Sequence, residues 1–279
     1  MNVLSLFDGM SCGQIALNKL GIKVDNYFAS EIKTHAIQVT QDNYPKTIQL
    51  GSVEFVTKEM LCNYKIDLLI GGSPCQDLTI INNKKNGLNG DKSRLFYEYL
   101  RVLKEIKPKY FLLENVASMK NIDKNIITEL LGVDPILINS DLVSAQHRRR
   151  LYWTNIPNVK QPKDKNISLK DVINYNDISE EKMSIKKLAF IKRKLITMYV
   201  RVDGKKSLPI TARGYCAWNT QFITLPNGKL RDLTLNEYKI LQTIPKKYKI
   251  NLIKSKATDL IGDGWTVDVI AHIFKNIKL

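Results

Sequence analysis

The chain has 279 residues, of which 44% are hydrophobic, enough for one large domain or for one large and one small domain. This composition excludes global disorder, and no apolar run approaches the roughly 20 residues of a membrane-spanning helix. The formal net charge of +16 favours a polyanionic partner, most simply nucleic acid, although a lysine-coding, AT-rich genome would also produce a solvated basic surface.

Strands and helices alternate through the first 155 residues. The apolar runs and their glycine and proline boundaries predict strands at 3–7, 24–29, 47–50, 67–70, 110–113, 136–139 and 151–153. Helices are predicted between them at 14–20, 33–43, 94–107 and 124–131. Such alternation favours an α/β fold with an open, mostly parallel sheet. The polar segment 76–93 predicts a long loop, of a length that is usually functional.

The alternation stops after about Asn155. Residues 156–235 carry 16 Lys and Arg against 7 Asp and Glu, a net charge of +9, which indicates a separate, smaller, basic domain. A helical pattern resumes at 234–242, and a last helix is predicted at 267–277. The expected domains are therefore 1–155 and 156–235, followed by C-terminal helices at 236–279 that return to the first domain.

The cysteines and the N-terminus bear on the compartment. The four cysteines lie far apart without metal-ligand spacing, so neither a disulfide nor a metal site is expected. The first residues enter a strand without the charge pattern of a signal peptide. A cytoplasmic, reduced protein is therefore expected.

Distinctive side chains follow four predicted strands. In an open α/β sheet, ligands bind beyond the carboxyl ends of the strands. The residues at these ends are Phe7-Asp8-Gly9 with Gly13, Glu31, Pro74-Cys75 and Glu114-Asn115. A glycine turn followed by an acid after the second strand is typical of nucleoside binding, and fits S-adenosylmethionine as well as NAD. The incomplete G-x-G-x-x-G pattern counts against a dinucleotide.

Cys75, Glu114 and the run Gln146 to Arg150 are candidates for chemistry. Cys75 follows a glycine turn and Pro74, a position for a nucleophile, but also for a small buried thiol. Glu114 could face the same pocket or cap a helix. The basic run could bind an anion or belong to a solvated surface.

Five motifs in order resemble those of the C5-cytosine DNA methyltransferase family. They are Leu6-Phe7-Asp8-Gly9 through Gly13, Gly72-Ser73-Pro74-Cys75-Gln76, Glu114-Asn115-Val116, Gln146 with Arg148 and Arg150, and Arg231-Asp232-Leu233-Thr234 with Glu237 and Leu241-Gln242. The stretches Ala29-Ser30-Glu31, Gly262-x-x-Trp265 and Val269-Ile270 resemble the de novo branch of the animal enzymes. The compact, lysine-rich chain favours a bacterial or phage member.

The resemblance implies a fold and an activity. The fold is the Rossmann-like S-adenosylmethionine-dependent methyltransferase fold, a mostly parallel sheet with helices on both faces, and the small basic domain would recognise the target. The activity is that of a DNA (cytosine-5-)-methyltransferase acting on a base flipped out of double-stranded DNA, as in DNA methylation and restriction–modification. S-adenosyl-L-methionine is the implied cofactor, and neither a membrane nor a metal is implied.

The resemblance also assigns residues. The catalytic set is Cys75 attacking C6, Glu114 acting on N3, Arg150 holding O2, and Arg148 supporting Glu114 or a nearby phosphate. The cofactor set is Phe7, Asp8, Gly9, Gly13, Glu31, Ile32, Ser52, Val53, Gly72, Pro74, Asp263, Gly264 and Trp265. Within it, Phe7 would stack on adenine, Glu31 would bind ribose hydroxyls and Trp265 would cover the methionine side.

Two departures from the family pattern concern the cofactor. Ser52 stands where the family usually has an acid after the third strand, and Gly262-Asp263-Gly264-Trp265 replaces the usual Gly-Asn-Ser/Ala-Val.

The DNA-binding candidates are Ile81, Arg201 and Arg213. Ile81 lies in the loop 76–93, expected to be a lid, at the motif position of a side chain that wedges into the base stack. It could instead anchor the loop to the core. Arg201 and Arg213 are chosen because only nine of the 43 basic residues are arginine, the side chain that grips a base edge with its planar fork.

Three other functions stay open. A branch of the same fold methylates cytosine in transfer RNA. A catalytically silent, cofactor-dependent DNA-binding protein would share the fold, although the intact Pro74-Cys75 and Glu114-Asn115 argue against it. A nicotinamide oxidoreductase is disfavoured by the glycine pattern and the basic charge.

Overall fold

The computed structural model describes residues 1–74, 88, 90, 94–180, 188–189, 191, 200–212 and 220–278. These residues form two compact units. Unit 1 comprises Met1–Ile138, Arg149–Gln161 and Ile270–Leu279, and unit 2 comprises Asn139–Arg148 and Pro162–Val269. These bounds differ from the predicted domains, because unit 2 also takes in 139–148 and most of the C-terminal helices. Side-chain hydrogen bonds between segments far apart in sequence join these parts, and local patterns do not reveal them.

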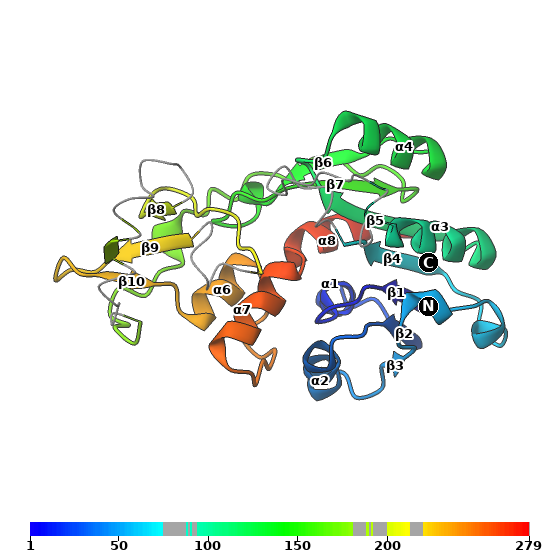
Figure 1. The fold of residues 1–279 in the computed structure, drawn as a ribbon, viewed down its shortest axis with the longest axis horizontal. Coiled ribbons are helices and arrows are strands. Elements are labelled where there is room, and N and C mark those ends of the chain that lie inside the picture. Colours follow the sequence, from blue (N-terminus) through cyan, green and yellow to red (C-terminus); the bar gives the residue numbers. More distant parts are fainter. Residues whose placement is uncertain are drawn as a thin grey trace. The chain divides into compact units, whose positions relative to one another are not determined.

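A seven-stranded sheet forms the centre of unit 1 (Figure 1). Its strands are β1 (Asn2–Leu6), β2 (Asn26–Ser30), β3 (Ile48–Gln49), β4 (Leu68–Gly72), β5 (Tyr110–Val116), β6 (Ile136–Asn139) and β7 (Arg149–Thr154). Their order is β3-β2-β1-β4-β5-β7-β6, so the direction of winding reverses beside β1. The pairs β1–β2, β1–β4, β2–β3 and β4–β5 are parallel, whereas β5–β7 is antiparallel. The predicted mostly parallel α/β sheet is confirmed.

Helices connect the strands of unit 1. They are α1 (Cys12–Lys19), α2 (Thr34–Asn43), α3 (Leu95–Ile106) and α4 (Asn121–Leu131), with short 3-10 turns η1 (Val53–Phe55) and η2 (Glu59–Leu61). Two of them end at residues with left-handed backbone: Lys107 after α3, which Pro108 follows, and Gly132 after α4. Within the described ranges, no helix is long and apolar enough to cross a membrane.

The core of unit 1 lies along the central strands. All seven residues of β5 are buried, as are four of the five residues of β1. Their side chains join one hydrophobic cluster that includes Leu6, Leu69, Leu113 and Trp153. The Trp153 indole N–H donates to the Thr128 hydroxyl at 3.0 Å, so this buried polar group is satisfied. Burial on both faces explains the continuous apolar runs of these strands.

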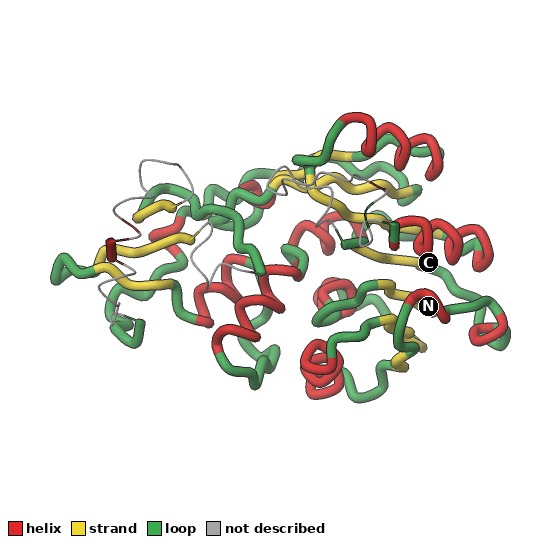
Figure 2. The backbone as a smooth tube through the Cα atoms, in the orientation of Figure 1, coloured by secondary structure: helices red, strands yellow, loops and turns green. Residues whose placement is uncertain are grey.

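Unit 2 combines a small sheet with helices (Figure 2). Its elements are η4 (Ser140–Leu142), η5 (Leu169–Asp171), β8 (Val200–Val202), β9 (Thr220–Thr224), β10 (Leu230–Asp232), α6 (Leu235–Leu241) and α7 (Lys254–Asp263), and α8 (Val267–Phe274) begins in it. The sheet order is β10-β9-β8, with β9–β10 antiparallel and β8–β9 parallel. Sequence analysis missed these strands and α7, because strands of three to five residues are too short to show a period.

A buried ion pair joins β10 to α6. Arg231 donates to both carboxylate oxygens of Glu237, at 2.8 and 2.7 Å, and both side chains are almost wholly buried. Glu237 also accepts from the Thr234 amide at 2.8 Å, as part of a capping box, and from the Asn174 amide at 3.0 Å. Part of the late helix motif therefore holds unit 2 together.

We predict that Glu237→Gln destabilises the protein by ~3–5 kcal/mol, because it leaves the Arg231 charge buried without its partner. Denaturant unfolding of the full chain measures this change. Glu98→Gln is the matched control. It breaks the partly exposed pair with Arg101 on α3, at 2.8 Å, and should cost at most about 1 kcal/mol. Equally small effects of the two substitutions would contradict the structural role of the buried pair.

Candidate active site

The backbone after β1 makes an unusual turn. Phe7, Gly9 and Ser11 all have left-handed backbone, with φ of 57°, 58° and 56°. Such a conformation costs a non-glycine residue roughly 1–2 kcal/mol. Hydrogen bonds from the Asp8 amide to the Ser30 carbonyl and from the Ser11 amide to the Asp8 carbonyl, both 3.1 Å, hold the turn. We call residues 7–11 the β1 loop; strain held in this way is common at ligand sites.

Glu31 ties the β1 loop to the segment before α2. Its Oε2 accepts the Gly9 amide at 2.7 Å, and its Oε1 accepts the amides of Ile32 and Lys33 at 2.8 and 2.9 Å. An ionised carboxylate has about four acceptor positions, so one stays available for a ligand hydroxyl. Among the described residues, no atom lies within 4 Å of the position where a Gly9 side chain would begin. A ligand can therefore approach this backbone closely.

Asp8 places a second carboxyl group in the β1 loop. Tyr27 donates its hydroxyl to Oδ1 at 2.9 Å, and Ser11 donates to Oδ2. The carboxyl group is shielded from water, and this burial raises the pKa of Asp8 from 3.8 to about 6, against the lowering effect of its hydroxyl donors. Asp8 therefore titrates close to neutral pH, a property shared by many functional carboxyl groups.

Ile32, Ser52 and Val53 lie at the ends of β2 and β3. Ile32 is 71% exposed, so its apolar surface is open to a ligand. Val53 is buried in the core cluster. The Ser52 hydroxyl lies 3.4 Å from Oε2 of Glu54, an exposed acid two residues beyond the position where the family has one. Sequence analysis did not single out Glu54, although an acid near a missing acid is a readable signal.

The ends of β4 and β5 meet at one edge of the sheet. Gly72 pairs with Glu114 in the parallel register. The buried Asn115 amide donates to the Ser73 carbonyl and hydroxyl, at 3.3 and 3.1 Å. This anchors the Ser73-Pro74 segment; the next residue, Cys75, lies outside the described residues.

Arg150 forms the ion pair with Glu114. The distance from Nε to Oε1 is 2.8 Å, and both side chains are more than four-fifths buried. Because β7 runs antiparallel to β5, its first residues lie beside the last residues of β5, with Val116 opposite Arg150. Glu114 is not beyond the strand end, as predicted, but inside β5, which this pairing extends to Val116.

Arg148 has a different set of partners. Its guanidinium donates to the backbone carbonyls of Ile210, Gly262 and Gly264, at 2.7, 3.1 and 2.9 Å, all within unit 2. It therefore fixes the turn that leads to Trp265. Arg148 was expected to support Glu114 or a nearby phosphate, and Arg150 is the residue that forms an ion pair with Glu114. The three bonds from Arg148 to backbone carbonyls suit a residue that positions the chain. Asp263, Gly264 and Trp265 all belong to unit 2.

Of the DNA-binding candidates, only Arg201 is described. It lies in β8, partly buried, and donates to the Lys206 carbonyl at 3.0 Å. Ile81, Arg213 and the expected lid, apart from Leu88 and Gly90, lie outside the described residues. Within the described part of the chain, no group of three or more His, Cys, Asp and Glu could hold a metal ion.

Comparison with known proteins identifies the family. The sequence profile described as "C-5 cytosine-specific DNA methylase" matches residues 1–195 and 186–279. The chain belongs to the C-5 cytosine-specific DNA methylase family. Members of this family take their methyl group from S-adenosylmethionine.

Relatives from two phages show the extent of the sequence match. The orphan methyltransferase M.SPRI of Bacillus phage SPR is 27% identical over 98% of this chain and 58% of its own length. The orphan methyltransferase M.Rho11sI of Bacillus phage rho11s is 34% identical over 54% of this chain and 32% of its own length. The chain thus spans less than two thirds of these relatives.

A solved methyltransferase structure shows the fold. The Entamoeba histolytica methyltransferase EhMeth matches all of this chain and 99% of its own, with a TM-score of 0.80 and 17% identity. This supports the predicted methyltransferase fold over essentially the whole chain.

We predict that Asp8→Asn changes the pH dependence of stability. Because the pKa of Asp8 in the folded protein lies above its ordinary value, its contribution to stability is complete below pH 4 and is lost as pH rises to about 6. Asparagine does not titrate. As pH rises from 4 to 6, the free energy of unfolding of the variant should therefore increase relative to that of the parent. Denaturant unfolding over this range measures the difference.

Asp25→Asn is a control for which the change of stability with pH has the opposite sign. The N-terminal ammonium lowers the pKa of Asp25, so that carboxylate contributes stability that is lost as pH falls. A difference between Asp8→Asn and the parent that stays constant from pH 4 to 6 would refute the Asp8 assignment.

Proposed function

We propose that this chain is a DNA (cytosine-5-)-methyltransferase, which transfers a methyl group from S-adenosylmethionine to C5 of cytosine in double-stranded DNA. Family membership and the methyltransferase names of the phage relatives support it. The net charge of +16 suits a nucleic acid partner. The observation that carries the proposal is the Glu114–Arg150 ion pair at the sheet edge where Ser73 and Pro74 lead to Cys75.

The β1 loop fits the cofactor. S-adenosylmethionine supplies an electrophilic methyl group on a positively charged sulfur, and the carboxyl groups of Asp8 and Glu31 suit a cation in an otherwise basic protein. The remaining acceptor position of Glu31 suits ribose hydroxyls, and exposed Ile32 suits the flat face of a purine. We therefore assign five residues to cofactor binding: Phe7, Asp8, Gly9, Glu31 and Ile32. For Asp263, Gly264 and Trp265 the assignment rests on the resemblance alone.

Cys75 and Glu114 divide the activation of cytosine between them. The Cys75 thiolate adds to C6, while Glu114 protonates or hydrogen-bonds N3, so that electron density reaches C5. Arg150, paired with Glu114, is placed to hold O2 of the same ring. After methylation, a base removes the C5 proton, and the electrons of that bond expel the thiolate from C6.

The basic unit 2 is the proposed contact with nucleic acid. Lysines attract the phosphates without regard to sequence, and Arg201 and Arg213 are the candidates for reading bases. The target cytosine must leave the helix stack, and Ile81 is the candidate to fill the gap.

Transfer RNA is the second candidate substrate. The basic charge of the protein does not distinguish DNA from transfer RNA as the substrate, because both nucleic acids are polyanions. The solved structures are under 25% identical and support the fold alone. The substrate experiment below therefore uses both.

We predict that Cys75→Ala abolishes methyl transfer and leaves cofactor binding intact, because alanine cannot form the bond to C6. Transfer of tritiated methyl groups to unmethylated genomic DNA and to unmodified tRNA measures the loss and identifies the substrate. The parent should also form a covalent complex with DNA in which 5-fluorocytosine replaces cytosine, because C5 then carries no removable proton.

The exposed free cysteine Cys62 provides the control, and Cys62→Ala should match the parent in both assays. Methyl transfer by Cys75→Ala at the parental rate would refute the covalent mechanism. Transfer to tRNA alone would replace DNA with RNA as the substrate.

We predict that Glu114→Gln slows the single-turnover rate by ~10²–10⁴, the usual contribution of a positioned proton donor. DNA affinity should change less, because the substitution keeps the shape of the side chain. Glu105→Gln, which loses an ion pair to Arg101 on α3 at 3.1 Å, controls for loss of charge. An unchanged single-turnover rate in Glu114→Gln would rule out its role on N3.

A further inference from the structure

Tyr27 connects the start of β2 to the β1 loop. The residue is buried, and its hydroxyl donates to Oδ1 of Asp8 at 2.9 Å. Burial and the Asp8 charge raise the pKa of Tyr27 well above its ordinary value, so its hydroxyl stays protonated and remains a donor throughout the working pH range. None of the motifs above includes this tyrosine.

Gly13 makes room for this contact. A Cβ at Gly13 would lie 3.2 Å from the Tyr27 hydroxyl oxygen and 2.2 Å from Cδ1 of Ile70. Any larger residue at position 13, in the first turn of α1, would therefore push the side chains of Tyr27 and Ile70 away. Sequence analysis assigned Gly13 to the cofactor; the structure adds a reason that depends on Tyr27.

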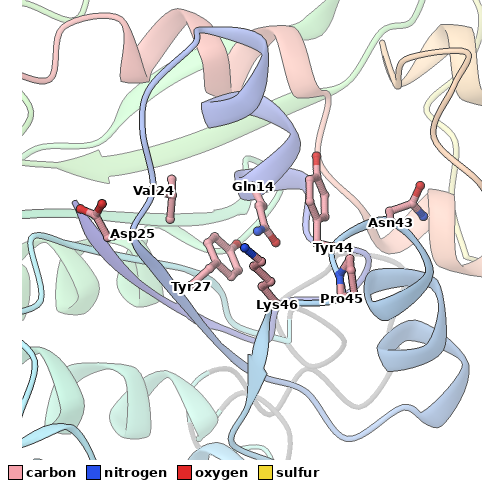
Figure 3. A pocket seen from close by; sticks show the side chains of 8 residues that line it. All are labelled: Gln14, Val24, Asp25, Tyr27, Asn43, Tyr44, Pro45 and Lys46. Atoms are coloured by element: carbon pink, nitrogen blue, oxygen red, sulfur yellow. The ribbon is translucent and has the colours of Figure 1, made fainter.

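A cavity borders the same tyrosine. It measures about 310 Å³ and its lining includes Tyr27, Tyr44, Gln14 and Lys46 (Figure 3). Side chains beside a cavity have fewer packing contacts on that side. On its other side the hydroxyl bonds to Ser5 and to Asp8, and the bond to Asp8 links it to the β1 loop.

We propose that Tyr27 is a positioning residue for cofactor binding: its hydroxyl, given room by Gly13, holds Asp8 and through it the left-handed backbone of the β1 loop. The inference rests on the proposed placement of S-adenosylmethionine at this loop. The loop contains two strained non-glycine residues, Phe7 and Ser11, and the partly buried hydrogen bond from Tyr27 to Asp8 opposes their relaxation.

Several groups act on the Asp8 carboxyl. The hydroxyls of Ser5, Ser11 and Tyr27 lower its pKa, whereas burial, the largest effect, and the charge of Glu31 raise it. Removal of the Tyr27 hydroxyl therefore raises the pKa of Asp8 further. A protonated Asp8 attracts a cationic cofactor less. As the pH is lowered, the affinity of a variant without this hydroxyl should therefore begin to fall at a higher pH than that of the parent.

The test is Tyr27→Phe in the full chain, which keeps the ring and removes the donor. Calorimetry with S-adenosylmethionine from pH 5 to 8 should show a Kd about tenfold higher at pH 7, the effect of one hydrogen bond to a charged acceptor. The pH at which affinity falls should move upward. In steady-state methylation, KM for the cofactor should rise about tenfold, and kcat should stay within about twofold.

Tyr44→Phe is the matched control, because Tyr44 lines the same cavity and its hydroxyl bonds to Asn18. It should bind the cofactor as the parent does, with the same pH profile. An equal loss in both variants, or a lower melting temperature of Tyr27→Phe without a shift in its pH profile, would show a packing role and overturn the proposal.

Glu31→Ala separates this inference from the proposed function. If Glu31→Ala loses affinity and Tyr27→Phe does not, the role of Tyr27 is wrong and the placement of the cofactor stands. If both variants bind as the parent does, the cofactor does not bind at this loop.

Discussion

The parallel register of β1, β4 and β5 determines where the functional groups of unit 1 lie. Leu6 pairs with Gly71, and Gly72 pairs with Glu114, so β1 and β4 end within one residue of each other, beside Glu114, and β5 continues to Val116. Main-chain hydrogen bonds hold this alignment, and the buried apolar side chains specify it, because a slip of one residue would turn each of them to the other face. The β1 loop, the segment before Cys75 and the Glu114 carboxylate are consequently brought to one edge, although more than 100 residues separate the first from the last.

This edge differs in charge from the protein as a whole. Two carboxyl groups, Asp8 and Glu31, lie within the β1 loop and its neighbouring turn, while the chain carries a net charge of +16. Salt screens solvent-exposed charges that lie more than roughly 10 Å apart, so the exposed lysines elsewhere do not cancel a local acidic region. An acidic place and a basic surface therefore coexist in one molecule.

The sequence predicted the strand and helix alternation of unit 1 because each buried strand is a short apolar run with clear boundaries. The partners of individual side chains were harder to predict from the sequence. Arg148 and Arg150 are two residues apart, yet β7 begins between them, so one bonds to backbone of unit 2 and the other to Glu114. Antiparallel pairing of β7 could not be deduced from composition. Tyr27 was missed because its partner, Asp8, belongs to another strand end, although a buried tyrosine usually finds a hydrogen-bond partner for its hydroxyl.

Unit 2 is assembled from two separate stretches of chain, and this limits how it could be exchanged between relatives. The short stretch 139–148 provides Gln146, which donates to the Leu241 carbonyl and accepts the Ile210 amide, and it provides Arg148. A chimera that took only 162–269 from this protein would import these backbone groups without their partners. A recombination event that transplants an intact unit 2 must therefore also carry the ten-residue stretch that precedes β7, which ties the exchange of unit 2 to the arginine motif itself.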